Sequence, residues 1–420
     1  MKKKIITYIF SSDDVKKDFL LYEEFYREAC KKFKKFYFIN LTRVIDKKKS
    51  NNDKKFIKKE FPKNLVIIEP KNYQSFKSFL DKKEVVTFIA IGRELKYFKT
   101  LYILKKYNCK LLINLTIGYT GQSKFSSNYN LSLNNKIKFF LKYFLFNKMV
   151  WVIFRFLVLI NFFPKIEILF EGSKKNVGIY NNYLSKKINR RFPLLNLNYI
   201  KNIEHVNFRS FERLLKQSKK LETKYVVFLD SGFGFDEVTQ FDEKITEKAK
   251  IKYYLSLKKL LIKLSKIYNK KIVVCLHPKT NKNEVIKYLD NIDIKQHQTL
   301  NYITKSEIVL FHDSSSILDA IFLQKKIINI RSSLMGNYYK LSNKKYSRDI
   351  KIPVIHLSEK NKIDKKYIES FFNNKKKLYI NYINNFLTFD LMNQKKIKDK
   401  NDLKGSLQMI SIIKNKFFND

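Results

Sequence analysis

The sequence predicts an α/β protein with two domains, each a parallel sheet covered by helices, plus a basic amphipathic helical insertion and a helical tail. Three observations support this. The 420 residues exceed what one ordinary core holds, and hydrophobic residues make up 45% of them. Strand-like and helix-like runs alternate in both halves of the chain. Between the halves, the alternation gives way to an apolar, aromatic and basic stretch.

The first half alternates short β-branched runs with longer runs of helical spacing, which is typical of a parallel sheet covered on both faces. Its opening apolar run is too short for a signal peptide, and Asp13 and Asp14 follow closely, so we expect a first strand there. The expected strands are 4–10, 36–41, 64–70, 85–92, 110–116 and 166–173, and the expected helices are 18–33, 93–107 and 210–220.

The insertion at 134–165 is apolar and aromatic, but lysines and Arg155 recur in it. No Asp or Glu occurs between Glu94 and Glu167. Charges recur too often for a spanning helix, which needs ~20 mostly apolar residues. An amphipathic helix at an anionic membrane surface fits this composition. A helical pair buried against its own domain fits it nearly as well.

The second half repeats the alternation, so we expect a second Rossmann-like domain. The predicted domains are 1–220 and 221–360, followed by a basic helical tail at 361–420. Thr299 is expected to cap a helix. The expected strands are 224–232, 271–279, 293–296, 307–313 and 326–330, and the expected helices are 253–268, 283–289, 299–306, 314–324 and 362–387.

The formal net charge of +48 suggests nucleic acid or an anionic surface as a partner. The lysines, however, are spread along the whole chain, which is typical of a solvated surface in a protein from an AT-rich genome. We therefore expect no nucleic-acid partner. Cys30, Cys109 and Cys275 lie far apart and form no metal-binding spacing, which fits a reducing cytoplasm.

Three polar clusters follow predicted strands of the second domain: Asp230-Ser231-Gly232, His277-Pro278-Lys279 and 312–316. Ligands of open parallel sheets bind outside the carboxyl ends of the strands. One sheet would gather all three clusters at one edge, which makes this edge the candidate site.

The 312–316 cluster combines His312 and Asp313 with Ser314, Ser315 and Ser316 at the start of a predicted helix. A helix N-terminus exposes N–H groups and favours anions, and small hydroxyls can donate to a phosphate without crowding it. The alternative is that one serine caps the helix and the others are filler. Three serines after a buried strand favour the anion site.

His277 emerges at the end of an apolar strand, and Pro278 stops that strand. Its imidazole could donate to a phosphate oxygen or assist a leaving group, and Lys279 could neutralise phosphate charge. The alternative is an ordinary loop histidine beside a surface lysine. Asp230 could act as a base, bind a sugar hydroxyl or bond the turn backbone. Asp319, His205, His297 and His356 are expected to be structural.

The order "FLDSGF", then "KIVVCLHPK", then "FHDSSSILDAIFLQKKIINI" resembles bacterial surface-polysaccharide glycosyltransferases of the GT-B fold, over roughly residues 200–335. It is most similar to surface carbohydrate biosynthesis proteins of capsule and lipopolysaccharide pathways. More distantly it is similar to bacterial sialyltransferases and Kdo transferases. In those enzymes the His-Pro histidine and the serines contact the phosphate and nucleotide of a CMP-sugar. The resemblance implies these roles for His277 and for Ser314, Ser315 and Ser316.

The general base of that wider group lies in an acidic motif ending in glycine, which this sequence lacks, so the base stays unassigned. The resemblance implies a metal-independent glycosyltransferase with a nucleotide-sugar co-substrate and no other cofactor. It also implies that the domain at 1–220 holds the acceptor and that the domain at 221–360 binds the nucleotide-sugar. The acceptor would be a glycan or a lipid-linked molecule at the inner face of the cytoplasmic membrane. A polyol-phosphate transferase or a sugar epimerase could share the fold. From other classes, a basic nucleic-acid-binding protein or a membrane-associated protein without catalytic activity is the alternative.

Overall fold

The computed structural model describes residues 3–12, 15–46, 61–91, 94–115, 146–172, 200–207, 212, 214, 222–231, 233, 245–277, 280–334, 351–357, 363–373, 375–383 and 404–418. The chain divides into two compact units, each of which is described by itself. Unit 1 comprises Met1–Gly118, Phe139–Glu212 and Thr388–Asp420, and unit 2 comprises Tyr119–Lys138 and Arg213–Leu387.

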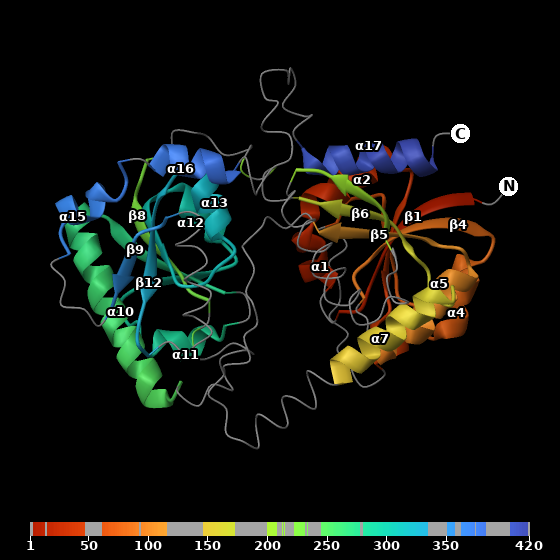
Figure 1. The fold of residues 1–420 in the computed structure, drawn as a ribbon, viewed down its shortest axis with the longest axis horizontal. Coiled ribbons are helices and arrows are strands. Elements are labelled where there is room, and N and C mark those ends of the chain that lie inside the picture. The colour runs from red at the N-terminus through yellow and green to blue at the C-terminus, as the bar shows by residue number, and fades with distance from the viewer. Residues whose placement is uncertain are drawn as a thin grey trace, which may run out of the picture. The chain divides into compact units, whose positions relative to one another are not determined.

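Unit 1 is built on a sheet whose described strands all pair in parallel, in the order β3-β2-β1-β4-β5-β6-β7. Helices cover both faces, with α1, α2 and α17 on one and α4, α5 and α7 on the other (Figure 1). The strands are β1 (Lys3–Phe10), β2 (Phe36–Asn40), β3 (Leu65–Ile68), β4 (Lys83–Ile89), β5 (Lys110–Leu115), β6 (Ile166–Glu171) and β7 (Ile200–His205). The helices are α1 (Val15–Leu21), α2 (Glu23–Lys32), α3 (Thr42–Ile45), α4 (Tyr73–Leu80), the 3-10 turn η3 (Leu95–Tyr97), α5 (Phe98–Lys106), α7 (Phe146–Leu159) and α17 (Gly405–Phe417).

The side chains of β1 show how its sequence builds both layers. Ile6, Tyr8 and Phe10 pack under α1, α2 and α17, whereas Ile5 and Ile9 pack under α4, α5 and α7. Successive side chains of a strand point to opposite faces, so a strand covered on both sides reads as a continuous apolar run. This is why β1 lacks the polar alternation of a half-exposed strand.

The last described helix, α17, completes the core of unit 1. Its Met409, Ile410 and Ile413 are buried in the same cluster as α2. The Glu212 carboxylate accepts hydrogen bonds from the backbone N–H and the hydroxyl of Ser406, in the first turn of α17. A carboxylate is stabilising there, because the first N–H groups of a helix have no partner within it. The predicted tail at 361–420 is therefore divided, with α17 in unit 1 and the helices before residue 384 in unit 2.

Unit 2 holds a second sheet whose described strands are all parallel, in the order β10-β9-β8-β11-β12-β13. Two such sheets in one chain confirm the predicted fold class. The strands are β8 (Tyr225–Leu229), β9 (Lys271–Leu276), β10 (Asp293–Gln296), β11 (Ser306–Phe311), β12 (Lys326–Arg331) and β13 (Val354–His356). The helices are α10 (Glu247–Tyr268), α11 (Lys282–Ile286), α12 (Thr299–Thr304), α13 (Ile317–Phe322), α15 (Lys365–Ser370) and α16 (Lys375–Tyr382).

The longest helix, α10, begins at Thr246, whose hydroxyl accepts the Ala249 N–H as an N-cap. It ends at Asn269, which adopts the left-handed conformation common at helix C-termini. Its buried face includes Tyr253, Leu257 and Leu264, which pack on the central strands. This packing brings Tyr253 and Tyr254, near the start of α10, to the sheet.

Several predicted elements have different bounds in the structure. The helix expected at 18–33 is two helices that meet at Tyr22, whose hydroxyl donates to the Asn114 carbonyl. Thr299 is the first helical residue rather than the cap, since Gln298 precedes it in the cap position. The sequence analysis did not single out α3, α4, β7, β13 or α17. Only Glu212 and Leu214 of the predicted helix at 210–220 are described. The start of the insertion, 134–145, lies outside the described residues.

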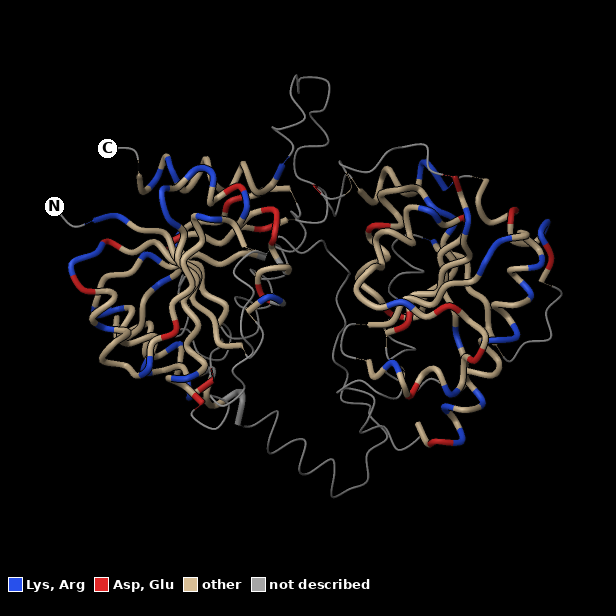
Figure 2. The backbone as a smooth tube through the Cα atoms, turned by 180° about the vertical axis from the view of Figure 1, so that it is seen from behind, with Lys and Arg blue, Asp and Glu red and all other residues tan. Residues whose placement is uncertain are grey.

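Basic residues recur on most elements of both units, with acidic residues among them (Figure 2). None of the helices in the described part is long and apolar enough to cross a membrane. The three cysteines are free and buried, and burial raises the pKa of each thiol to about 12.

Candidate functional site

The three polar clusters follow neighbouring strands of unit 2, in the spatial order β9, β8, β11. Leu229 of β8 pairs with Cys275 on one side and with Phe311 on the other. The residues that continue these strands therefore emerge at one level of one sheet edge. The structure brings Asp230, His277 and His312 to this common edge.

His312 is fully buried at this edge, and protein atoms contact both of its ring nitrogens. Its Nδ1 lies 2.6 Å from the Tyr253 hydroxyl, and its Nε2 accepts the Ser231 backbone N–H at 3.3 Å. An Nε2 that accepts a hydrogen bond carries no proton, so the proton sits on Nδ1 and is donated to the tyrosine oxygen. The imidazole thus joins α10 to the loop after β8.

Burial lowers the pKa of His312 to about 3, and the ring stays neutral. Phe228 and Phe233 contribute to its apolar surroundings, with ring centroids 5.4 and 6.5 Å from the imidazole. Asp230 Oδ1 lies 3.9 Å from Nε2, which would suit an ion pair if the histidine were charged. Because Nε2 accepts the Ser231 N–H, we read this contact as a neutral histidine beside a carboxylate.

Asp230 is itself buried, although it follows directly on β8. Its backbone N–H donates to the Cys275 carbonyl at 3.0 Å, which continues the sheet pairing by one residue. Its Oδ1 accepts a weak hydrogen bond from the Tyr254 hydroxyl at 3.4 Å. Burial and this nearby carboxylate raise the pKa of Tyr253 well above its ordinary value. Asp230 therefore connects the end of β8 to α10.

His277, in contrast, is exposed at the end of β9. Its carbonyl accepts the Thr280 N–H at 2.9 Å and the Gln296 side-chain amide at 3.0 Å. The same amide nitrogen donates to the Thr280 carbonyl at 2.9 Å. Gln296, at the end of β10, therefore holds the backbone on both sides of the His277 turn. Lys279 lies outside the described residues.

The three serines form a turn that leads into α13. The helix begins at Ile317, three residues later than predicted, and it is six residues long. The N–H groups of Ile317 and Leu318 donate to the carbonyls of Ser314 and Ser315, and the Ser314 hydroxyl accepts the Ser316 N–H at 3.3 Å. Serine side chains compete with the helix for backbone groups, which explains the late start. These N–H groups are already engaged, so an anion here would meet mainly hydroxyls, of which Ser315 is the exposed one.

Two residues at this edge were missed by the sequence analysis, Asn329 and Arg331 of β12. The buried Asn329 side-chain amide lies 3.4 Å from the carbonyls of Phe311 and His312. Arg331 is half-buried, with its Nε 3.4 Å from Asn329 Oδ1, and burial lowers the pKa of its guanidinium. Ten arginines occur among the 86 basic residues. Arg331 directly follows the predicted strand 326–330, and arginine is rare in this lysine-rich chain. These two features were the signal that could have identified Arg331.

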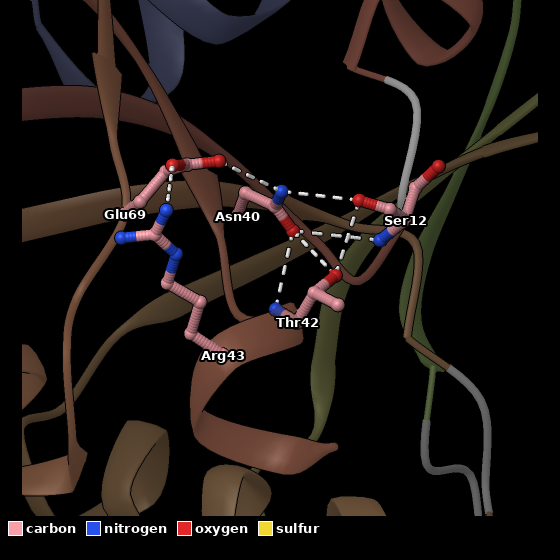
Figure 3. A network of polar contacts seen from close by, with 5 residues as sticks. All are labelled: Ser12, Asn40, Thr42, Arg43 and Glu69. Atoms are coloured by element: carbon pink, nitrogen blue, oxygen red, sulfur yellow. Dashed lines mark hydrogen bonds and ion pairs between the residues drawn. The ribbon is translucent and has the colours of Figure 1, made fainter. Parts of the chain in front are cut away.

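A second polar network lies at the carboxyl ends of β1, β2 and β3 in unit 1 (Figure 3). The buried Asn40 side chain donates to the Ser12 carbonyl at 3.1 Å and to Glu69 Oε1 at 3.1 Å. Its Oδ1 accepts the Thr42 hydroxyl at 2.8 Å and the Thr42 N–H at 3.2 Å. Arg43 Nη2 lies 3.9 Å from Glu69 Oε2. This network fixes the chain at Ser12, and the acids after it, Asp13 and Asp14, lie outside the described residues.

Neither a protein-family model nor a curated protein matches this sequence. Solved structures do match in fold. The wall teichoic acid polymerase TagF matches with a TM-score of 0.50 at 11% identity, over 98% of this chain and 90% of that chain. A glycosyltransferase from Rickettsia africae matches with a TM-score of 0.45 at 13% identity, over the whole of both chains. The UDP-GlcNAc 2-epimerase from Methanocaldococcus jannaschii has the same score and identity, over 98% and 99%.

The chain has the GT-B fold. This fold comprises two Rossmann-like domains in one chain, as the sequence predicts. Open parallel sheets bind their ligands at the carboxyl ends of the strands, which makes the edge formed by β9, β8, β11 and β12 the candidate site of this chain. No group of His, Cys, Asp and Glu side chains suited to a metal ion occurs among the described residues.

Proposed function

We propose that this protein transfers a sugar from a nucleotide-sugar to a surface glycan or a lipid-linked acceptor. The observation that carries the proposal is the shared edge of β9, β8 and β11 in unit 2, where exposed His277 follows β9 and exposed Ser315 follows β11, the two strands that flank β8. Parallel sheets bind nucleotides at such an edge, and histidine and serine donate hydrogen bonds to phosphate oxygens. The GT-B fold, which the likeness to TagF supports, is compatible with this chemistry.

In this proposal the residues at the edge divide into two groups. His277, Ser314, Ser315, Ser316 and Lys279 contact the phosphate and nucleotide. Asp230 and His312, which are buried, act as positioning residues. His312 accepts the Ser231 N–H and Asp230 accepts the Tyr254 hydroxyl, so together they hold the end of β8 and the residue that follows it. This division assigns Asp230 and His312 supporting roles. The sequence analysis left the roles of base, sugar ligand and turn residue open for Asp230, and it placed His312 in the anion-binding cluster.

Arg331 is a further phosphate partner in this proposal. It lies on β12, the strand next to the one that leads into the serine turn. A guanidinium presents its donors as a planar fork that matches two phosphate oxygens. With His277 and Lys279, it would offset the charge that develops on the leaving phosphate, without a metal ion.

The donor we favour is a CMP-sugar, because the HPK and SSS segments resemble those of CMP-sugar-dependent transferases. The acceptor would be met at the inner face of the cytoplasmic membrane. A second candidate is polyol-phosphate transfer, which the likeness to a wall teichoic acid polymerase favours. Both reactions use a nucleotide-activated donor, so both place a phosphate at the same edge of unit 2.

Calorimetric titration of the purified protein with CMP, CDP, UDP and GDP tests the proposal. We expect CMP to bind, and His277→Ala and Ser315→Ala to weaken binding by about 10-fold or more each, as expected for lost hydrogen bonds to a charged group. The matched control is Ser370→Ala, an exposed serine on α15. A preference for CDP would favour polyol-phosphate transfer, and a preference for UDP would overturn the CMP donor. If a folded protein binds none of the four, the transferase proposal fails.

A further inference from the structure

Helix α7 in unit 1 is apolar on the side that faces the solvent as well as on the side that faces the core. Phe154 and Val158 are buried against α4, α5 and the sheet, and Val150 is buried as well. A surface helix of a globular protein normally carries polar residues on its outer side. Here the described side chains that α7 exposes are all apolar, namely Met149, Val152, Ile153, Phe156 and Leu159, of which Met149 is 62% and Phe156 is 50% exposed.

The apolar surface continues beyond the end of α7. Ile160 and Phe162, in the turn after the helix, are also exposed. The Phe162 ring stacks on exposed Tyr102 of α5, with 4.7 Å between the ring centroids and 25° between the ring planes. These residues and the exposed side of α7 form one surface, which we call the α5–α7 face. Single exposed apolar residues are ordinary, but a continuous group of this kind marks an interaction site.

The charged residues of α5 beside the α5–α7 face are all basic. Lys99 and Lys106 stand three residues before and four residues after Tyr102, which places them on the same side of α5. Lys105 Nζ donates to Asn161 Oδ1 at 2.6 Å, which ties α5 to the turn after α7. The sequence has no Asp or Glu between Glu94 and Glu167, so no acid of these elements offsets the lysines.

We propose that the α5–α7 face docks on an anionic lipid bilayer. The apolar side chains would enter the boundary between headgroups and acyl chains, and the lysines would reach anionic headgroups, as in helices that lie in the membrane plane. The 14-residue helix α7 is shorter than the ~20 residues of a membrane span, so it would lie on the surface. This proposal goes beyond sugar transfer and does not depend on it.

Two other occupants fit the α5–α7 face less well. A second copy of the chain would bring the same lysines together, and no acid of α5 or α7 is present to pair with them. A nucleic acid would match the lysines, but the exposed side chains of α7 are mostly aliphatic, whereas single strands stack on aromatic rings.

Vesicle flotation of the full-length protein tests the membrane proposal. We expect the protein to float with vesicles of phosphatidylcholine and phosphatidylglycerol, and to float much less with phosphatidylcholine alone or at high salt. Phe156→Glu and Ile153→Glu each lower the partition into the vesicles by about 10-fold or more, because each replaces an apolar side chain that would enter the bilayer with a charged one. Both residues are exposed in the protein, so unit 1 keeps its core.

The matched control is Leu255→Glu, which places the same charge at a 48% exposed leucine on α10 of unit 2. It should leave flotation unchanged. Equal flotation of the wild type and both α7 variants overturns the proposal. It is also overturned if the α7 variants change only the oligomeric state in gel filtration, or only the binding of single-stranded RNA. CMP titration of the same variants separates the two proposals, since loss of flotation with intact nucleotide binding concerns only the α5–α7 face.

Discussion

The Tyr253 hydroxyl lies 2.6 Å from Nδ1 of His312, and both side chains are fully buried at the carboxyl edge of the unit 2 sheet. Tyr253 belongs to α10 and His312 follows β11, so the contact joins two residues that are 59 positions apart in the sequence. On its other side the imidazole accepts the Ser231 N–H. One neutral ring therefore links a helix, a strand end and the loop after β8.

Tyr253→Phe removes the acceptor of the His312 Nδ1 proton and leaves it buried without that partner. We expect a loss of about 1–3 kcal/mol in the free energy of unfolding, the usual cost of an unsatisfied buried polar group. Urea denaturation measures this loss. Tyr367→Phe, at an exposed tyrosine of the same unit, should change stability by less than ~0.5 kcal/mol. Equal effects of the two substitutions would contradict the described contact.

His312 predicts a loss of stability in acid. Its pKa is about 3 in the folded protein, against an ordinary value of 6.5. Between these values the unfolded chain binds a proton that the folded protein excludes, so stability falls as the pH drops through 6.5 toward 3. The slope from this one group is at most about 1.4 kcal/mol per pH unit.

His312→Asn, which cannot titrate, should show a shallower decline than the wild type over this pH range, whatever its stability at neutral pH. Urea denaturation at successive pH values gives both slopes. In the wild type, the His312 imidazole resonance should not titrate above pH 5 by nuclear magnetic resonance. If stability falls with the same slope in the wild type and in His312→Asn, and if His312 titrates normally near pH 6.5, then the imidazole of His312 is accessible to solvent.

Gly405→Ala should undo the docking of α17. A Cβ at this position would lie 2.1 Å from the Asn207 carbonyl oxygen, so the backbone would have to move. We expect a loss of more than about 2 kcal/mol, as for other substitutions that force atoms into packed regions. Thermal unfolding gives the magnitude. Ser411→Ala, at an exposed position of the same helix, should be neutral, and an equally mild effect of Gly405→Ala would contradict the close approach.

Arg331→Lys keeps the charge at the edge of β12 but loses the planar fork of donors. If Arg331 holds a phosphate through two of its N–H groups, CMP affinity falls by about 10-fold, and Arg331→Gln lowers it further. Calorimetry measures both affinities. Full CMP affinity in Arg331→Gln would exclude the guanidinium from the phosphate site. The roles of His277 and Ser315 would then still be tested by His277→Ala and Ser315→Ala.

The strands that build the candidate site could be predicted because they are buried on both faces. The apolar runs of β8, β9 and β11 indicate by themselves that these strands are buried. The polar residues that follow each run indicate the carboxyl edge of the sheet. The strands β7 and β13 were missed, because IKNIEH and VIH are half-polar or short and sit at the ends of their sheets.

Contacts between distant elements could not be predicted. Tyr253 and Tyr254 fit the apolar side of a helix, and nothing local indicates that one meets His312 and the other Asp230. Serines favour turns as well as helix starts, so their sequence did not determine where α13 begins. The network around Asn40 was missed for the same reason, since Ser12, Asn40 and Glu69 come from three different strand ends.

The position of α17 has a consequence for synthesis on the ribosome. Glu212 and Ser406 are 194 residues apart, yet both belong to unit 1. Translation runs from the N-terminus to the C-terminus, so β1 to β7 are made long before α17, the last of the three helices that cover one face of their sheet. Until then Tyr8, Phe10 and their neighbours lack part of their cover. Unit 2, whose described elements are contiguous from β8 to α16, can complete its own core first. Unit 1, most of which is translated before unit 2, thus gains its last described core helix only after unit 2 has been made.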